Sequence, residues 1–108
     1  MHSFAYKNGT LYCENVNLQE LADKEGTPLY VYSKQTILNH FHRLREALAP
    51  LNAEVAYAVK ASSNIAILNL MARNGAGFDI VSGGELFRVL KAGGDPSKCC
   101  LLYTSDAA

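Results

Sequence analysis

Lys60 is the residue whose type and position best suit covalent chemistry. It ends residues 54–60, where β-branched, aromatic and small side chains predict a buried strand. Alternation along that strand would place Lys60 on one face with Ala56 and Ala58. Because an ammonium is expensive to bury unless it is paired or neutralised, this lysine is a candidate nucleophile that forms a Schiff base with a carbonyl. The alternative is a lysine whose stem covers apolar surface while its amine reaches water.

Acidic and small residues follow the next predicted strand, over 77–81. If the two strands are neighbours, the Asp79 carboxylate approaches Lys60 and orients its amine; otherwise Asp79 accepts backbone hydrogen bonds. Glu85 follows Ser82 at capping-box spacing, which predicts a hydrogen bond to the Ser82 backbone N–H. Alternatively, Glu85 turns toward the same end of the sheet as Lys60. Gly83-Gly84 adds a weak signal for a bound anion or cofactor at a helix start.

The elements that would position these residues alternate between strands and helices. Turn residues, caps and apolar spacing predict their bounds. The predicted elements are a hairpin over 4–13, a helix over 18–25 between Asn17 and Gly26, a strand over 29–32, a helix over 34–49 capped by Ser33, the strand over 54–60, a helix over 64–73, the strand over 77–81, a helix over 84–92 and a strand from about 98.

Strand–helix alternation predicts an α/β fold with parallel strands. The unit length and the short loops favour a (β/α) barrel. A doubly wound sheet is the competitor, but neither of the first two strand-to-helix turns carries a glycine-rich phosphate motif. A whole barrel needs roughly 250 residues. The 108 residues are therefore expected to supply about three units of a truncated barrel.

The composition excludes several classes of function. The chain has 10 basic and 10 acidic residues, so its formal net charge is zero. This balance favours neither nucleic acid nor an anionic membrane as a partner. No apolar run approaches signal-peptide or transmembrane length. The three cysteines form neither a disulfide framework nor a zinc spacing, and His40 and His42 are interpreted as ordinary helix residues, so no metal site is predicted. We expect a cytoplasmic, reduced protein.

Three stretches together resemble the opening of the diaminopimelate decarboxylases. They are residues 57–64 (Tyr-Ala-Val-Lys-Ala-Ser-Ser-Asn), 77–86 (Gly-Phe-Asp-Ile-Val-Ser-Gly-Gly-Glu-Leu) and 92–94 (Ala-Gly-Gly). The resemblance extends from about residue 4 to residue 98. It departs beside the lysine, where relatives usually have Lys-Ala-Asn and this chain has Lys60-Ala61-Ser62. These enzymes use pyridoxal 5'-phosphate in an alanine-racemase-like, TIM-type (β/α)8 barrel.

The resemblance implies roles for individual residues. Lys60 matches the lysine that holds the cofactor covalently, and Asp79, Ser82 and Glu85 match residues close to the cofactor. The implied reaction is decarboxylation of meso-2,6-diaminopimelate, a small amino acid, to L-lysine. The implied full-length protein is a homodimer, and residues 1–108 by themselves are expected to be inactive.

The resemblance also implies a division of the chain. Residues 1–27 would belong to a second, β-sandwich domain, and residues 28–98 would form the first units of the barrel. Residues 99–108 depart from the family and are interpreted as a foreign or frame-shifted tail.

Neighbouring families remain as alternatives. Ornithine- and arginine-type decarboxylases share the Val-Lys and Phe-Asp elements, but residues 82–86 look more like the diaminopimelate branch. Alanine racemases usually continue past the lysine with an aromatic-glycine pair, which is absent here. A non-enzymatic pyridoxal-phosphate carrier protein shares the barrel but has no sandwich domain, so the predicted hairpin argues against it.

Overall fold

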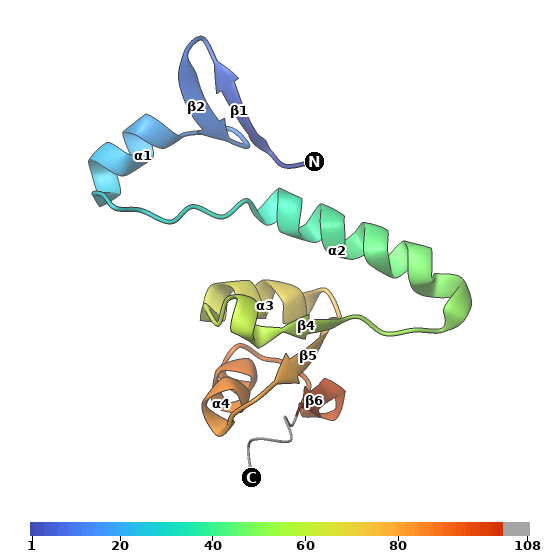
Figure 1. Cartoon of the computed structure of the whole chain (residues 1–108). Helices are drawn as coiled ribbons and strands as arrows, with labels where there is room; N and C mark the ends of the chain where they lie inside the picture. The colour runs from blue at the N-terminus through green and yellow to red at the C-terminus, as the bar shows by residue number, and fades with distance from the viewer. Residues whose placement is uncertain (103–108) are drawn as a thin grey trace. The chain divides into compact units, whose positions relative to one another are not determined.

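The hairpin that Asn8-Gly9 predicts opens the first of two structural units, Met1–Arg43. In the computed structural model, which describes residues 1–102, β1 (Phe4–Lys7) pairs antiparallel with β2 (Thr10–Cys13) (Figure 1). Asn8 and Gly9 have φ values of 51° and 79°, as a two-residue turn that matches strand twist requires. A short third strand, β3 (Val16–Asn17), pairs with β2 and was not predicted, since two residues carry no readable periodicity.

Helix α1 (Leu18–Glu25) has the bounds that its caps predict. The Asn17 side chain accepts hydrogen bonds from the amides of Gln19 and Glu20, at 2.9 and 3.2 Å, and thereby satisfies two donors of the first turn. At the other end Gly26 has φ 89°, a conformation that glycine adopts without steric penalty. The helix is thus specified at both ends by local chemistry.

The long helix α2 (Lys34–Leu48) is confirmed to within one residue, together with its cap. The Ser33 hydroxyl accepts the amide of Thr36 at 3.0 Å, and Ser33 is buried. That hydroxyl also donates to the Glu14 carboxylate at 2.9 Å, which in turn accepts the amide of Gln35 at 3.2 Å. The start of α2 therefore has both a local cap and one supplied by the turn after β2.

The predicted strand over 29–32 is wrong. These residues adopt no regular secondary structure, and no strand pairs with them in the described part of the chain. Leu29, Tyr30 and Tyr32 are 38%, 86% and 52% exposed. A short apolar run predicts a strand only if a neighbouring strand takes up its backbone groups, and that condition lies outside the local sequence.

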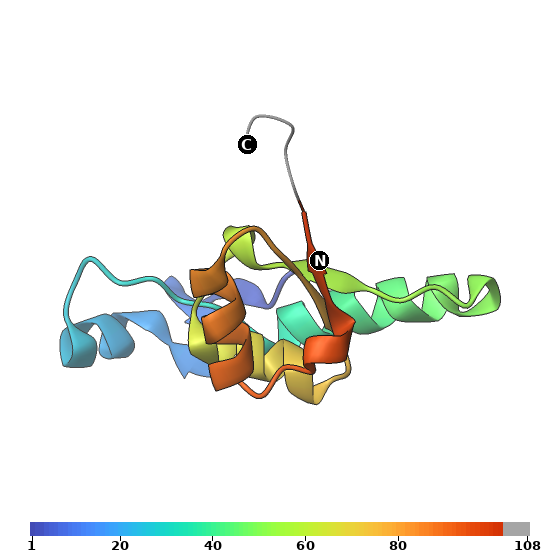
Figure 2. The ribbon, with the colours of Figure 1, turned by 90° about the horizontal axis from the view of Figure 1, so that it is seen from below.

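The second unit, Leu44–Ala108, contains a parallel three-stranded sheet, as the strand–helix alternation predicts. Its order is β4 (Ala56–Ala58), β5 (Gly77–Ile80) and β6 (Cys99–Leu101). Helices α3 (Ile65–Arg73) and α4 (Gly83–Lys91) connect consecutive strands and pack beside each other (Figures 1 and 2). Up to residue 102 this unit also contains three short 3-10 helices: η1 (Ala49–Leu51), η2 (Val59–Ala61) and η3 (Pro96–Lys98).

The core of this unit is centred on Val59, Leu68, Phe78 and Val89, whose side chains are fully buried. Gly94 passes close to two of them: a Cβ built there would lie 2.5 Å from Val89 Cγ1 and 3.1 Å from Phe78 Cε2. Only a residue without a side chain fits that approach. The buried core therefore includes the loop after α4 as well as the sheet and the helices.

The buried face of α3 starts inside the helix and not at its first residue. Ile67, Leu68 and Met71 are buried, whereas Ile65 is 37% exposed. Asn64 caps the helix by accepting the amide of Ala66, so Ile65 is the first helical residue and stands at the open end. The buried stripe begins one half-turn later.

The structure describes only the first part of the predicted foreign tail, residues 99–108. Residues 99–101 form β6, which pairs with β5, whereas residues 103–108 lie outside the described residues. Within residues 1–102 no helix is long and apolar enough to cross a membrane.

Candidate active site

Lys60 lies on a turn and not on a strand, which corrects the predicted strand over 54–60. Strand β4 ends at Ala58, and residues 59–61 form the 3-10 helix η2. Val59 is completely buried, whereas Lys60 is exposed. Burying Val59 turns the backbone inward directly after Ala58, so Lys60 no longer alternates with Ala56 and Ala58. The lysine still leaves the sheet at the carboxyl end of its strand.

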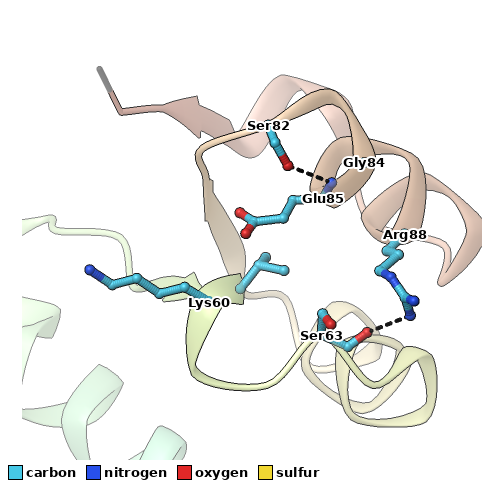
Figure 3. A pocket seen from close by; sticks show the side chains of 7 residues that line it. Lys60, Ser63, Ser82, Gly84, Glu85 and Arg88 are labelled. Atoms are coloured by element: carbon cyan, nitrogen blue, oxygen red, sulfur yellow. Dashed lines mark hydrogen bonds between the residues drawn. The ribbon is translucent and has the colours of Figure 1, made fainter. Parts of the chain in front are cut away.

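The Lys60 amine has no hydrogen-bond or ion-pair partner among residues 1–102. Figure 3 shows its side chain extending away from Glu85. An exposed amine is fully hydrated and keeps its rotamer freedom, so the amine itself contributes little to the fold. It remains available for a ligand.

Asp79 is on the strand next to the one that leads to Lys60, so the condition set for its approach to the lysine, that the two strands are neighbours, is met. In the parallel pairing of β4 and β5, Asp79 is the partner of Ala58, two residues before the lysine. Asp79 is half-buried, whereas its neighbours Phe78 and Ile80 are buried on the other face. Within the described residues, no hydrogen bond or ion pair joins Asp79 to Lys60. The sheet thus places the two residues at one edge without a hydrogen bond or ion pair between them.

Ser82 and Glu85 form part of a capping box. The Ser82 hydroxyl accepts the amide of Glu85 at 3.1 Å, as predicted. Glu85, however, accepts the backbone N–H of Val81 at 2.9 Å, one residue before the expected Ser82 N–H. Because Ser82 is fully extended (φ −153°, ψ 161°), the Val81 amide is the one that faces the carboxylate. Glu85 therefore closes the bend between β5 and α4.

An open pocket of about 420 Å³ lies between these segments (Figure 3). Its lining residues come from η2, the loop after it and the first turns of α4: Val59, Lys60, Ser63, Ser82, Gly84, Glu85 and Arg88. Three of the four predicted site residues, Lys60, Ser82 and Glu85, meet here, whereas Asp79 does not line the pocket. Glu85 thus lines this pocket and also accepts the Val81 amide.

Arg88 and Ser63 are pocket residues that the sequence analysis missed. Arg88 Nη1 donates to the Ser63 carbonyl at 3.2 Å. Arg88 follows Glu85 by three residues on α4, so both side chains lie on one helix face. That spacing was the available signal for Arg88. Ser63 carried no comparable signal, because its carbonyl rather than its side chain makes the contact.

The pocket suits a ligand that has a carbonyl and an anionic group. Lys60 supplies an amine without a partner in the described chain, and Ser63 and Ser82 bring hydroxyl groups. Two cationic side chains and one carboxylate line the pocket, so its charge favours an anion. The lining residues therefore fit an aldehyde cofactor that carries a phosphate.

Comparison with known families agrees with this chemistry. The family model for the pyridoxal-binding domain of pyridoxal-dependent decarboxylases matches residues 34–105. The match spans two thirds of the chain and includes all four predicted site residues. The chain therefore belongs to the pyridoxal-dependent decarboxylases.

Individual proteins of this family show how similar the chain is to particular enzymes. The diaminopimelate decarboxylase of Haemophilus influenzae is 52% identical over 98 residues, which cover 91% of this chain and 24% of that protein. The crystal structure of diaminopimelate decarboxylase from M. jannaschii, also solved in complex with L-lysine, matches with a TM-score of 0.88 and 36% identity over 93% of this chain and 24% of its own. Lysine decarboxylase from Selenomonas ruminantium matches with a TM-score of 0.73 and 27% identity, over 89% of this chain and 26% of its own. The chain spans about a quarter of the length of these relatives.

Proposed function

We propose that this chain is part of a diaminopimelate decarboxylase, which uses pyridoxal 5'-phosphate to convert meso-2,6-diaminopimelate to L-lysine and carbon dioxide. The observation that carries the proposal is the exposed Lys60 amine, without a partner in residues 1–102, at the carboxyl end of a parallel strand. It occurs in a chain that is half identical to enzymes of that name. The structure with L-lysine supports a small amino acid as the ligand.

Four side chains have roles in this proposal. Lys60 would hold the cofactor through its amine nitrogen, and Asp79, Ser82 and Glu85 would lie close to the cofactor. When bound, pyridoxal phosphate supplies an aldehyde carbon and a ring that accepts electrons. The protein's own contribution at this edge is orientation: Ser82 starts α4, and Glu85 fixes the bend before it. Both keep the pocket wall in place beside Lys60.

The same proposal covers the architecture of the whole protein. Strands β4, β5 and β6 would be consecutive strands of a (β/α)8 barrel within residues 28–98 and the strand that follows. Their parallel order and helical connections support it. Residues 1–27 would belong to a β-sandwich domain, and residues 99–108 would end in non-native sequence. The complete protein would be a cytoplasmic homodimer, and residues 1–108 alone would be inactive.

A second candidate is decarboxylation of another basic amino acid. The structural match to a lysine decarboxylase, with a TM-score of 0.73, supports this second candidate. The pocket described here does not separate the two candidates, since Lys60, Ser82 and Glu85 serve the cofactor in either case.

Substrate comparison tests the proposal directly. The protein expressed from its complete gene, loaded with pyridoxal phosphate, should release carbon dioxide from meso-diaminopimelate far faster than from lysine, ornithine or arginine. Preference for one of the latter three would support the second candidate. Cofactor attachment without release from any of the four would contradict both.

A further inference from the structure

Two side chains from different elements hold the backbone just after Lys60. The Tyr57 hydroxyl, from β4, donates to the Ser62 carbonyl at 3.1 Å. Arg88, from α4, donates to the next carbonyl, that of Ser63, at 3.2 Å (Figure 3). Side-chain donors from two different elements therefore fix two consecutive carbonyl groups where the loop has no regular secondary structure.

The backbone before Lys60 is fixed by burial. Val59 has no exposed surface, and it is the residue immediately before the lysine. The turn η2 is only three residues long, and no side chain caps its start at Ala58. Short 3-10 turns have poor hydrogen-bond geometry, so their own hydrogen bonds stabilise them only weakly. The conformation of this turn therefore depends on Val59 on one side and on the two held carbonyls on the other.

The Lys60 side chain contributes nothing to its own placement. Its amine makes no hydrogen bond or ion pair with the rest of residues 1–102, so the backbone alone decides where the side chain starts. Tyr57 is well placed to act on that backbone, because its ring packs edge-on against the buried Phe78 ring, at 6.4 Å between centroids and 88° between planes. The hydroxyl that holds Ser62 is thus attached to the core.

We propose that Arg88 and Tyr57 are positioning residues that set the location of the Lys60 amine through the carbonyls of Ser63 and Ser62. The inference rests on the proposed function, since it assumes that Lys60 binds the cofactor. Arg88 acts in addition as a link between α4 and the lysine turn, because the same helix begins with Ser82 and Glu85. The two sides of the pocket therefore cannot shift independently. Reactions of a held nucleophile are sensitive to displacements of about 1 Å.

Three variants separate this role from general stability. Tyr57→Phe removes one hydroxyl and keeps the ring on Phe78, whereas Arg88→Met removes the guanidinium and keeps most of the length. Arg88→Lys restores a donor. Lys91→Met is the matched control, since Lys91 is another exposed cation on α4.

The variants are compared in the protein expressed from its complete gene. Two readouts are needed: amide exchange of residues 59–64 in the cofactor-free protein, and the rate at which added pyridoxal phosphate attaches to Lys60. In Tyr57→Phe and Arg88→Met we expect faster exchange in this segment and attachment slowed roughly tenfold. Arg88→Lys should recover most of the attachment rate, and Lys91→Met should match wild type.

The outcomes distinguish this inference from the proposed function. If wild type attaches pyridoxal phosphate and both Tyr57→Phe and Arg88→Met exchange and attach at its rate, the positioning role is wrong. If Arg88→Met fails to fold, Tyr57→Phe decides, and wild-type behaviour in both readouts overturns the inference. If wild type itself attaches none at Lys60, the proposed function fails first.

Discussion

The Glu85 carboxylate accepts the backbone N–H of Val81 at 2.9 Å and thereby closes the bend between β5 and α4. The same side chain lines the pocket beside Lys60. One residue therefore serves the fold and the candidate site, and a suitable pair of substitutions separates the two.

Glu85→Ala should lower the free energy of unfolding by about 1 kcal/mol, because the Val81 amide loses its acceptor. Glu85→Gln keeps an acceptor oxygen and should stay close to wild-type stability while changing the charge beside Lys60. Urea unfolding of both variants, made in the protein expressed from its complete gene, measures the difference. Equal stability of Glu85→Ala and wild type would show that water replaces the carboxylate without loss.

Lys60→Ala should abolish attachment of pyridoxal phosphate yet change stability by less than about 0.5 kcal/mol, since the side chain is exposed. Borohydride reduction followed by peptide mass analysis locates the label in wild type. Labelling at another lysine, or unchanged activity of Lys60→Ala, would remove Lys60 from the site.

Gly94→Ala should destabilise the second unit by about 1–3 kcal/mol, because the added methyl would overlap Val89 Cγ1 at 2.5 Å. Gly83→Ala is the control, since a Cβ there meets nothing within 4 Å. Thermal unfolding of the two variants, made in the protein expressed from its complete gene, should differ clearly. If both melt together, the loop after α4 relaxes more easily than the close approach suggests.

Burial raises the pKa of the Cys99 thiol above its usual 9.0, and the nearby charges of Asp95 and Cys100 act in the same direction. A raised pKa in the folded state stabilises the protein below the unfolded pKa, and this contribution is lost as the pH rises through the folded pKa. In a Cys100→Ser background, the rate of Cys99 alkylation should therefore still be rising with pH at 9.0 and should level off only above that pH. Alkylation in urea is the reference, and its rate should level off at lower pH.

Residues 1–108 expressed by themselves should lack a cooperative unfolding transition. Within the described sheet, β4 and β6 each pair on one side only, so two edges present unpaired amides and carbonyls. Amide exchange and thermal unfolding by circular dichroism test this expectation. A sharp transition with saturable cofactor binding would show that three strands suffice for a stable domain.

Local chemistry determined which parts of the fold were predictable. Asn17 and Gly26 bound α1 because a cap side chain and a left-handed glycine act within a few residues. The parallel sheet followed from the alternation of elements, and the placement of Asp79 next to the lysine strand followed from the sheet. These predictions needed no knowledge of distant contacts.

The failures involve contacts that are distant in sequence. The turn at Lys60 depends on the burial of Val59 in the core. The hydrogen bond from Arg88 to Ser63 joins residues 25 positions apart. Its acceptor is a backbone carbonyl, which every residue type possesses, so the identity of residue 63 gives no signal for it. Residue types alone therefore indicated that Lys60 could react, but not how its backbone is held.

The adjacency of Val59 and Lys60 also makes the site intolerant of changes in chain length. A deletion of one residue between Tyr57 and Val59 would move Lys60 to the place of a side chain with no exposed surface. The ammonium would then have to lose its hydration or the core would have to open, and either is strongly unfavourable. Selection on folding alone would thus reject such a deletion. The hydrophobic core therefore maintains the spacing between the strand and the lysine, independently of cofactor binding.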